Sequence, residues 1–451
     1  MVVAGVAADT TKQSAPDGDE QGSAKRPRHA VTALLDRLRD RLDVAQGKWN
    51  ALCPVKVDEE LPALATELAE ILSALRNFRG PVAEGLLRVA RDRLVLLELQ
   101  RGKTACAKEL LTEGGYLYRL SDAVLAPSHA IDECYLQGPH LPPEDGNLVA
   151  FVDNALPEPL LRDLQRVFAP SSPFWKETGY WSDDAFFSFE VPLGAAAVAA
   201  EQGGLGCGHP AVHAALLVAD IAASVAPKLL GPGQTPGYAE WWCHSKPHCA
   251  GHLLHFDQAD DAQVPVVSTV LFLSPEGVGG PTLVTAQRML DSKMVQHGWL
   301  CRPRENRLLL FDGRLLHGVI PGSGGQESVP SNGRRCTLMV ALCRERPELR
   351  QREGNVMPDP GSTKLAWPRM ATAGAPLDAV GRRLHAATAK PQRPDVVRVW
   401  KDVDPQANKL KGLSLSQDPP VDCPAPSRCF QGITPWRKIP DRLVSGEELF
   451  E

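Results

Sequence analysis

Apolar residues with helical spacing fill the first third of the chain. They recur every three or four positions over 31–42 and again over 61–75, which is the period of an amphipathic helix. A third segment, 81–100, starts with a proline, a residue suited to the first turn of a helix. We therefore predict a helical module over residues 29–126. The polar stretch 1–28 has too few large apolar side chains to fold, so we expect a disordered tail.

From residue 237 onward the apolar residues fall into short runs separated by glycine, proline and aspartate, a pattern typical of β-strands joined by turns. A strand at 148–152 and helices at 157–168 and 211–230 are expected before them. Seven or eight short strands indicate a sandwich or a jelly-roll barrel, so the expected fold class is α+β. The expected strands are 238–242, 253–256, 266–273, 282–284, 308–311, 315–320 and 336–342.

These patterns divide the rest of the chain in two. A domain over 147–344 follows a proline-rich connection at 139–144. Residues 345–451 are rich in proline and arginine and contain few periodic segments, so we expect a C-terminal extension of loops and short helices around the barrel, or partial disorder.

Composition and charge narrow the classes of function. Of the 451 residues, 43% are hydrophobic and 23% are charged, which is typical of a soluble globular protein. A net charge of -5 gives no electrostatic footprint for nucleic acid, which is therefore not favoured as a partner. No apolar run reaches the ~18 residues of a membrane span, so no membrane association is expected.

Cysteines and basic residues bear on location. The eleven cysteines follow no regular framework, and no secretory signal is recognisable, so reduced thiols and an intracellular, cytoplasmic protein are expected. The basic stretch at 25–28 could be a nuclear signal, although so few basic residues in a polar tail are more often simply solvated.

The tripeptide His255-Phe256-Asp257 carries the first candidate chemistry. Because residues two apart on a strand project to one face, His255 and Asp257 can both point inward while Phe256 points away. Two histidines and one carboxylate on one face of an iron(II) ion leave positions open for a co-substrate and for oxygen. The second histidine must come from elsewhere, and His317 lies in the expected strand at 315–320.

Further segments follow the tripeptide in a set order. A strand over 266–273 precedes a Gly-Gly-x-Thr turn at 279–282, a strand that delivers His317, and Arg335 on the last strand. Over 148–343 these segments resemble the Fe(II)- and 2-oxoglutarate-dependent dioxygenases, particularly the prolyl-4-hydroxylase-like branch of that superfamily. The resemblance implies a double-stranded β-helix core with flanking helices. It also implies Fe(2+) and 2-oxoglutarate as cofactors, with ascorbate as a candidate reductant.

Carried over position by position, the resemblance makes His255, Asp257 and His317 the iron ligands. It makes Arg335 the residue that pairs with the far carboxylate of 2-oxoglutarate. Arginine offers a planar fork that meets a carboxylate through two hydrogen bonds, and Thr337, on the same strand face, can add its hydroxyl. The implied reaction decarboxylates 2-oxoglutarate to succinate and oxidises a substrate, with hydroxylation, demethylation or desaturation as the outcome.

Two features depart from the prolyl-hydroxylase branch. The anchor of that branch is usually lysine, whereas this chain has Arg335, with Arg334 expected to face outward. An insertion over 321–333, rich in glycine, serine and proline, precedes the anchor and is expected to form a loop at the barrel mouth. These departures leave the identity of the substrate undetermined, but they do not change the expected cofactors.

The segment 243–252 is dense in cysteine and histidine and allows two interpretations. A zinc site is one, although no Cys-x-x-Cys pair is present and a proline and a glycine oppose a helix that would bring the histidines together. A strand and loop lining the pocket is the favoured interpretation, with Trp242, His244 and His248 touching substrate.

Each candidate residue also has an ordinary structural role. The histidines could be hydrogen-bonded core residues, Asp257 could cap a turn, and Arg335 could belong to a structural ion pair. Trp175, Tyr180 and Trp181 suit a pocket lip or, more often, the core. The ordered set of ligands, turn and arginine favours a site over these roles.

We therefore expect a 2-oxoglutarate-dependent dioxygenase whose substrate is a peptide residue or a small molecule. One alternative is a non-catalytic β-helix protein with a structural or vacant metal site, which binds a protein partner through residues 30–125. Another is a cupin-type metalloenzyme that needs neither 2-oxoglutarate nor Arg335.

Overall fold

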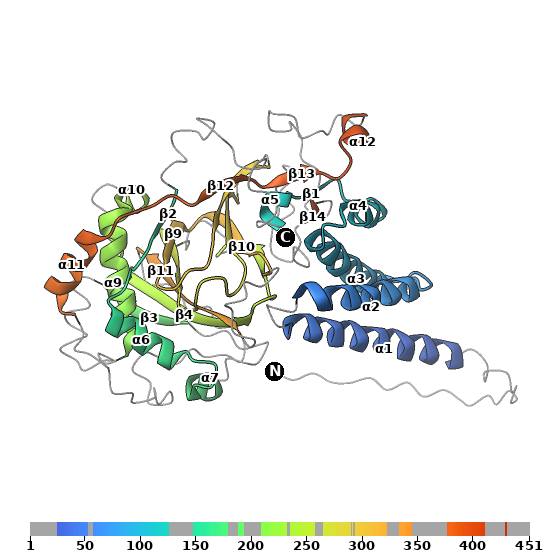
Figure 1. The fold of residues 1–451 in the computed structure, drawn as a ribbon, viewed down its shortest axis with the longest axis horizontal. Coiled ribbons are helices and arrows are strands. Elements are labelled where there is room, and N and C mark those ends of the chain that lie inside the picture. Colours follow the sequence, from blue (N-terminus) through green and yellow to red (C-terminus); the bar gives the residue numbers. More distant parts are fainter. Residues whose placement is uncertain are drawn as a thin grey trace, which may run out of the picture.

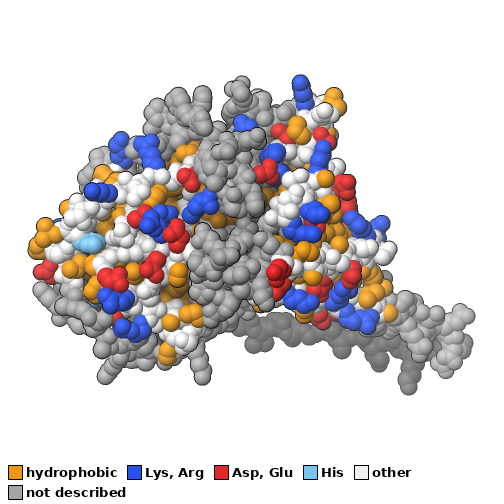
Figure 2. All heavy atoms as spheres, in the orientation of Figure 1, with side chains coloured by type: hydrophobic (Ala, Val, Ile, Leu, Met, Phe, Trp, Pro, Cys, Tyr) orange, Lys and Arg blue, Asp and Glu red, His pale blue; other side chains and the backbone are white. Residues whose placement is uncertain are grey.

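The computed structural model places the N-terminal helices beside a β-rich body (Figure 1). Among the described residues no helix is long and apolar enough to cross a membrane. On the face drawn in Figure 2, acidic and basic side chains are interspersed over the described surface. Most of the expected tail, together with Tyr180 and Trp181, lies outside the described residues. Those residues are 25–52, 57–125, 148–178, 188–193, 209–231, 235–257, 265–289, 291, 294–322, 333–344, 377–410 and 429–430.

Helices form where the leucine spacing predicts them, and neighbouring helices pack against one another (Figure 1). Leu42, Leu68 and Leu97 come from three successive helices and are almost fully buried in the same apolar cluster. The helices are α1 (Lys25–Asn50), α2 (Val57–Leu75), α3 (Pro81–Gln100) and α4 (Thr104–Glu113).

Two antiparallel sheets form the β-rich body. Successive strands from β4 to β11 alternate between the sheets, except for the hairpin of β7 and β8. One sheet has the order β2-β9-β6-β11-β4-β3 and the other the order β12-β8-β7-β10-β5. The strands of the first are β2 (Val149–Val152), β3 (Phe189–Pro192), β4 (Tyr238–Pro247), β6 (Val267–Phe272), β9 (Leu308–Asp312) and β11 (Arg334–Cys343). Those of the second are β5 (His252–His255), β7 (Thr282–Arg288), β8 (His297–Cys301), β10 (Leu315–Val319) and β12 (Asp395–Arg398).

Alternating side chains give the six-stranded sheet two apolar faces. Met339 of β11 belongs to a cluster that also contains Val284 and Trp299 of the opposite sheet. Its neighbours Leu338 and Val340 belong to a second cluster, shared with the helices on the outer face. Those helices are α6 (Glu158–Val167), α7 (Pro173–Thr178), α9 (Pro210–Val225), α10 (Pro227–Leu230) and α11 (Ala379–Thr388).

Three parts of the secondary-structure prediction were incomplete. The helix expected at 211–230 is interrupted, and α10 starts at Pro227, whose ring removes a backbone donor. Strands β3 and β8 of the two large sheets were missed. The extension after residue 344 contributes strands as well as short helices. One of these strands, β12, pairs with β8 at the edge of the five-stranded sheet. A small third sheet joins β1 (Tyr118–Leu120), β13 (Trp400–Asp402) and β14 (Cys429–Phe430), while α5 (Asp122–Leu125) and α12 (Pro405–Leu410) flank it in sequence.

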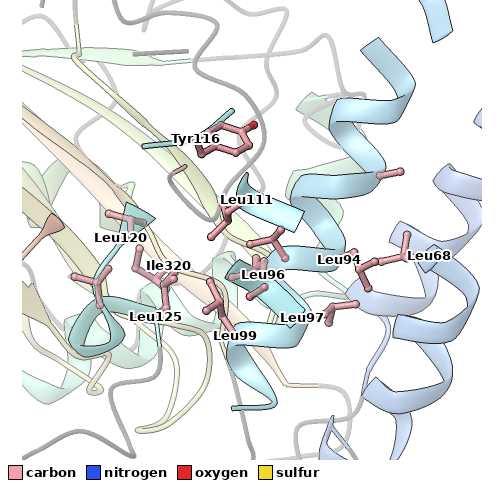
Figure 3. Packing of buried hydrophobic residues seen from close by; sticks show 14 of the residues in the cluster. Leu68, Leu94, Leu96, Leu97, Leu99, Leu111, Tyr116, Leu120, Leu125 and Ile320 are labelled. Atoms are coloured by element: carbon pink, nitrogen blue, oxygen red, sulfur yellow. The ribbon is translucent and has the colours of Figure 1, made fainter. Parts of the chain in front are cut away.

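The helical part and the five-stranded sheet share one apolar core. Leu99 of α3, Leu120 of β1 and Leu125 of α5 surround Ile320, the residue that follows β10 (Figure 3). Ile320 is fully buried and lies three residues beyond His317. The N-terminal helices therefore support the strand that carries one of the candidate metal ligands.

Candidate metal centre and its pocket

The three candidate ligands meet although two strands far apart in sequence carry them. His255, at the end of β5, is the direct cross-strand partner of His317 on β10, and their ring centroids lie 4.4 Å apart. Asp257 lies two residues beyond His255. One nitrogen from each histidine and one carboxylate oxygen lie within 4.8 Å of one another.

Backbone hydrogen bonds determine which nitrogen each histidine presents. Nδ1 of His255 lies 2.7 Å from the carbonyl oxygen of Leu253, and Nδ1 of His317 lies 2.9 Å from that of Leu315. A carbonyl oxygen can only accept, so each Nδ1 carries the proton and donates. In a neutral ring Nε2 then keeps its lone pair, which is the form that binds a metal. The Nε2 atoms of His317 and His255 lie 3.3 and 3.8 Å from Oδ1 of Asp257.

Asp257 is held by its second oxygen. The hydroxyl of Ser268, on β6, donates a hydrogen bond to Oδ2, so that Oδ1 is the oxygen that faces the histidines. Burial alone would raise the pKa of the Asp257 carboxyl, but His317, His255 and Ser268 together hold that pKa well below its usual range. Burial also opposes the charge on His317, yet Asp257 raises the pKa of that imidazole. The carboxylate is therefore ionised and oriented.

This donor set fits a divalent transition metal. Two imidazole nitrogens and one carboxylate oxygen converge from one side, which is the arrangement used by non-haem iron(II) sites with open coordination positions. Among the described residues, this is the only group of histidine, cysteine and acidic side chains close enough to hold an ion. The zinc interpretation of 243–252 is not supported, because the residues of that segment do not form such a group.

Arg335 lies in the same pocket and is 4% exposed. Its guanidinium donates a hydrogen bond of 2.9 Å to Oγ1 of Thr282 and lies 5.1 Å from the ring centre of Phe272. No carboxylate of the described residues pairs with it, and its Nε has no partner there. Burial lowers the pKa of Arg335 to about 10, so the side chain is a buried cation at neutral pH.

Thr337 adds a hydroxyl to the same wall. Its side chain is fully buried, and Oγ1 has no hydrogen-bond partner among the described residues. Arg334, by contrast, bonds to Ser245 through both its Nε, at 3.0 Å, and its terminal nitrogen, at 2.6 Å. Alternation along β11 therefore places Arg335 and Thr337 in the pocket and Arg334 outside it, as the residue spacing predicted.

The pocket between the sheets encloses about 570 Å³, including its open mouth. Asp257 is the only acidic side chain among the residues that line it. The described lining residues are Trp242, His244, Lys246, Ala250, Gly251, His252, His255, Asp257, Val270, Thr282, His317, Gly318, Val319, Arg335, Thr337 and Met339.

Two of the three residues expected to contact substrate line the pocket. Trp242 and His244 line the pocket from β4, whereas His248 is not among its lining residues. His248 lies in the turn after β4, where side chains no longer alternate between the two faces of the sheet. Its ring accepts a hydrogen bond from the backbone nitrogen of Gly279. Trp175, on the outer helix α7, is buried in the apolar cluster between the helices and the six-stranded sheet, so it has the core role that the sequence favoured.

His252 and Lys246 also line the pocket, and the sequence interpretation, which assigned the whole segment 243–252 to the pocket wall, did not single them out. His252 makes an edge contact with His255, with ring centroids 4.6 Å apart, and it stacks on His244 at 5.8 Å. Lys246 lies opposite Arg335 in the register of β4 and β11. Strand alternation from His244 would have indicated Lys246, but a local pattern cannot locate His252, which lies on the opposite sheet.

No family model matches the chain, and no curated protein matches it significantly. Similar solved structures include a prolyl-4-hydroxylase of Pseudomonas putida, 17% identical with a TM-score of 0.27, which covers 45% of this chain and 97% of that one. AviO1 of Streptomyces viridochromogenes is 15% identical with a TM-score of 0.25 and covers 45% and 95%. HygX of Streptomyces hygroscopicus, solved with nickel and 2-oxoglutarate bound, is 12% identical with a TM-score of 0.25 and covers 47% and 90%.

The first of these structures is a protein of the kind that the sequence resembles. Such low TM-scores are too weak to assign an activity. The functional assignment therefore depends on the geometry of the site.

Proposed function

We propose that this protein is an Fe(II)- and 2-oxoglutarate-dependent dioxygenase. The observation that carries the proposal is the buried cation Arg335, which has no carboxylate partner among the described residues and shares a pocket with the two histidines and Asp257. An unpaired buried charge is costly, and a carboxylate ligand would neutralise it. A ligand with a carboxylate at one end and a metal-binding group at the other would satisfy both ends of the pocket.

His255, Asp257 and His317 would hold the metal, and Arg335 with Thr337 would hold the far carboxylate of 2-oxoglutarate. When bound, iron and 2-oxoglutarate would supply the oxidising chemistry with molecular oxygen: one oxygen atom would enter the co-substrate, which becomes succinate and carbon dioxide, and the other would oxidise the substrate. The protein keeps both imidazoles in the tautomer that binds metal, through the carbonyl oxygens of Leu253 and Leu315. The guanidinium of Arg335 and the hydroxyl of Thr337 would fix the orientation of the co-substrate. Apolar lining residues such as Val270 and Met339 would limit the access of water.

We propose that the two sheets form a double-stranded β-helix, with all strands but β12 in the expected domain at 147–344. Support comes from the strand order, in which consecutive strands alternate between two antiparallel sheets from β4 to β11. The ligands lie on β10, on β5 and just after β5, so both histidines come from the five-stranded sheet, while Arg335 projects from the other sheet. The pocket thus opens between the sheets.

The proposed substrate is a peptide residue or a small molecule, bound against Trp242 and His244, which line the pocket. An aromatic ring and an imidazole suit a substrate with both apolar and polar parts. Hydroxylation is the proposed outcome, with ascorbate as a reductant that maintains the iron(II) state. The cytoplasmic location and a partner surface over residues 30–125 are further parts of the proposal.

Anaerobic titration of the purified protein with iron(II) and 2-oxoglutarate tests the function. We expect a weak visible charge-transfer band that needs both additions, followed by succinate release when oxygen is admitted. His255→Ala and Asp257→Ala should abolish both signals with the fold intact by circular dichroism. A folded wild-type protein that gives neither band nor succinate would contradict the proposal, and metal content without 2-oxoglutarate turnover would favour the non-catalytic or cupin-type alternative.

A further inference from the structure

His248 is buried at the point where three segments meet, and its side chain accepts a hydrogen bond. It is 2% exposed, and its Nδ1 lies 2.9 Å from the backbone nitrogen of Gly279, in the turn between β6 and β7. A backbone N–H can only donate, so Nδ1 is the acceptor and the neutral ring carries its proton on Nε2. Burial lowers the pKa of His248 to about 4, which keeps the ring neutral at physiological pH.

Gly279 lies directly against the side chain of Arg335. A Cβ atom at Gly279 would lie 2.4 Å from Cδ and 2.6 Å from Cβ of Arg335, closer than real atoms approach. The residue also has a φ of +84°, a conformation that favours glycine. The backbone of this turn is therefore the wall on which the stem of Arg335 rests. The same turn leads to Thr282, whose hydroxyl accepts the hydrogen bond of the guanidinium.

Backbone contacts tie His248 to a third segment. Its carbonyl oxygen accepts a hydrogen bond of 3.1 Å from the nitrogen of Gly322, which follows β10. The nitrogen of Ile320 in turn donates to the carbonyl oxygen of Pro281 at 3.0 Å. The turn after β4, the turn before β7 and the segment after β10 thus form one connected support around Arg335.

We propose that His248 is a positioning residue for the 2-oxoglutarate anchor: its hydrogen bond to Gly279 holds the Gly279–Thr282 turn where that turn fixes the guanidinium of Arg335. The inference rests on the proposed function, since it assumes that Arg335 binds the co-substrate. His248 is not among the described residues that line the pocket or form the candidate metal group. Its effect is expected on the affinity for 2-oxoglutarate and not on the affinity for the metal.

The test compares His248→Leu with His248→Asn. Leucine fills a similar space without an acceptor, whereas the asparagine amide oxygen can take the place of Nδ1. Dissociation constants of Mn²⁺ and of 2-oxoglutarate are measured on the full chain, the latter by anaerobic calorimetry with Mn²⁺ present. We expect His248→Leu to raise the dissociation constant of 2-oxoglutarate about tenfold and to leave that of Mn²⁺ within about twofold, and His248→Asn to restore near wild-type affinity.

Gly279→Ala provides an independent arm of the test, because the added methyl group would displace Arg335. It should weaken 2-oxoglutarate binding at least as much as His248→Leu and leave Mn²⁺ binding unchanged. If His248→Leu does not fold, His248→Ala, which also lacks an acceptor, takes its place in the comparison with His248→Asn. Wild-type affinity for 2-oxoglutarate in Gly279→Ala or in a folded His248→Leu, or equal losses in the Leu and Asn variants, would overturn the inference. Absence of 2-oxoglutarate binding in the wild type would instead overturn the proposed function.

Discussion

At the scale of single residues, one buried arginine has the clearest consequences for both stability and function. Arg335 is buried in the pocket, and among the described residues the one hydrogen-bond partner of its side chain is the neutral hydroxyl of Thr282, with the aromatic ring of Phe272 beside it. A buried charge without a counter-charge costs free energy in the ligand-free protein. The same charge gains strong, directed hydrogen bonds when a carboxylate enters. The charge of Arg335 therefore lowers the stability of the ligand-free protein and raises its affinity for the co-substrate.

Arg335→Met tests this opposition, with Arg334→Met as the matched control. Methionine keeps an unbranched stem and removes the charge, so we expect Arg335→Met to raise the melting temperature without ligand. It should also weaken 2-oxoglutarate binding roughly ten- to hundredfold, since hydrogen bonds to a charged group contribute about 1.5–3 kcal/mol. Thermal unfolding with and without 2-oxoglutarate measures both effects. If Arg334→Met lost the co-substrate instead, the assignment of the anchor would be off by one position.

At the scale of elements, helix α3 contains a buried acidic residue that faces a tyrosine. Asp92 is 6% exposed and accepts a hydrogen bond of 2.7 Å from the hydroxyl of Tyr116. Burial raises the pKa of Asp92 to about 6 from 3.8, although the hydrogen bond from Tyr116 and the charge of Arg91 oppose the shift. The folded helix therefore favours the protonated carboxyl more than the unfolded chain does.

The sign of the resulting pH dependence follows from this raised pKa. At a pH below the ordinary pKa of 3.8 the Asp92 carboxyl is protonated in both the folded and the unfolded state, so it does not change the free energy of unfolding. Between about pH 4 and pH 6 the unfolded chain binds fewer protons than the folded protein. The free energy of unfolding therefore falls as the pH rises through this range, by about 3 kcal/mol at most. We expect Asp92→Asn to be more stable than the wild type at pH 7.5 and equal to it near pH 4. Urea unfolding at both values checks this; a stability difference independent of pH would exclude the mechanism.

At the scale of the whole molecule, the helical part and the sheets are joined by a common core. Ile320 and Leu316 of the β10 region belong to the same buried cluster as Leu97 and Leu99 of α3 (Figure 3). Ile320 lies close in sequence to His317, so loss of the helices would expose the strand behind the metal centre. We therefore predict that the metal centre depends on the helices for its stability.

A protein truncated to residues 147–451, which lacks the N-terminal helices but keeps β12 and α11, tests this dependence. It would expose the apolar surface that the helices cover, so we expect aggregation or loss of cooperative unfolding together with loss of metal binding. A milder test keeps the full chain: Leu125→Ala should lower the free energy of unfolding by about 2–5 kcal/mol. A truncated protein that is monomeric, unfolds cooperatively and binds Mn²⁺ as the full chain does would show that the helical part is independent.

The sequence by itself determined which residue types line the site and which face of a strand each occupies. Two-residue spacing placed His255 with Asp257 and Arg335 with Thr337, because strand alternation is a local property. It also predicted the N-terminal helices from their apolar period. Together these observations indicated a metal and a carboxylate ligand.

Only the tertiary structure decided how distant segments meet. The pairing of His255 with His317, the lack of a described carboxylate beside Arg335 and the hydrogen bond between His248 and Gly279 all depend on contacts between strands and turns far apart in the chain. The strand at the edge of the five-stranded sheet escaped prediction for the same reason, since β12 is stabilised by its neighbour β8. Such pairings arise from packing over long sequence separations, which no local pattern of hydrophobic and polar residues encodes.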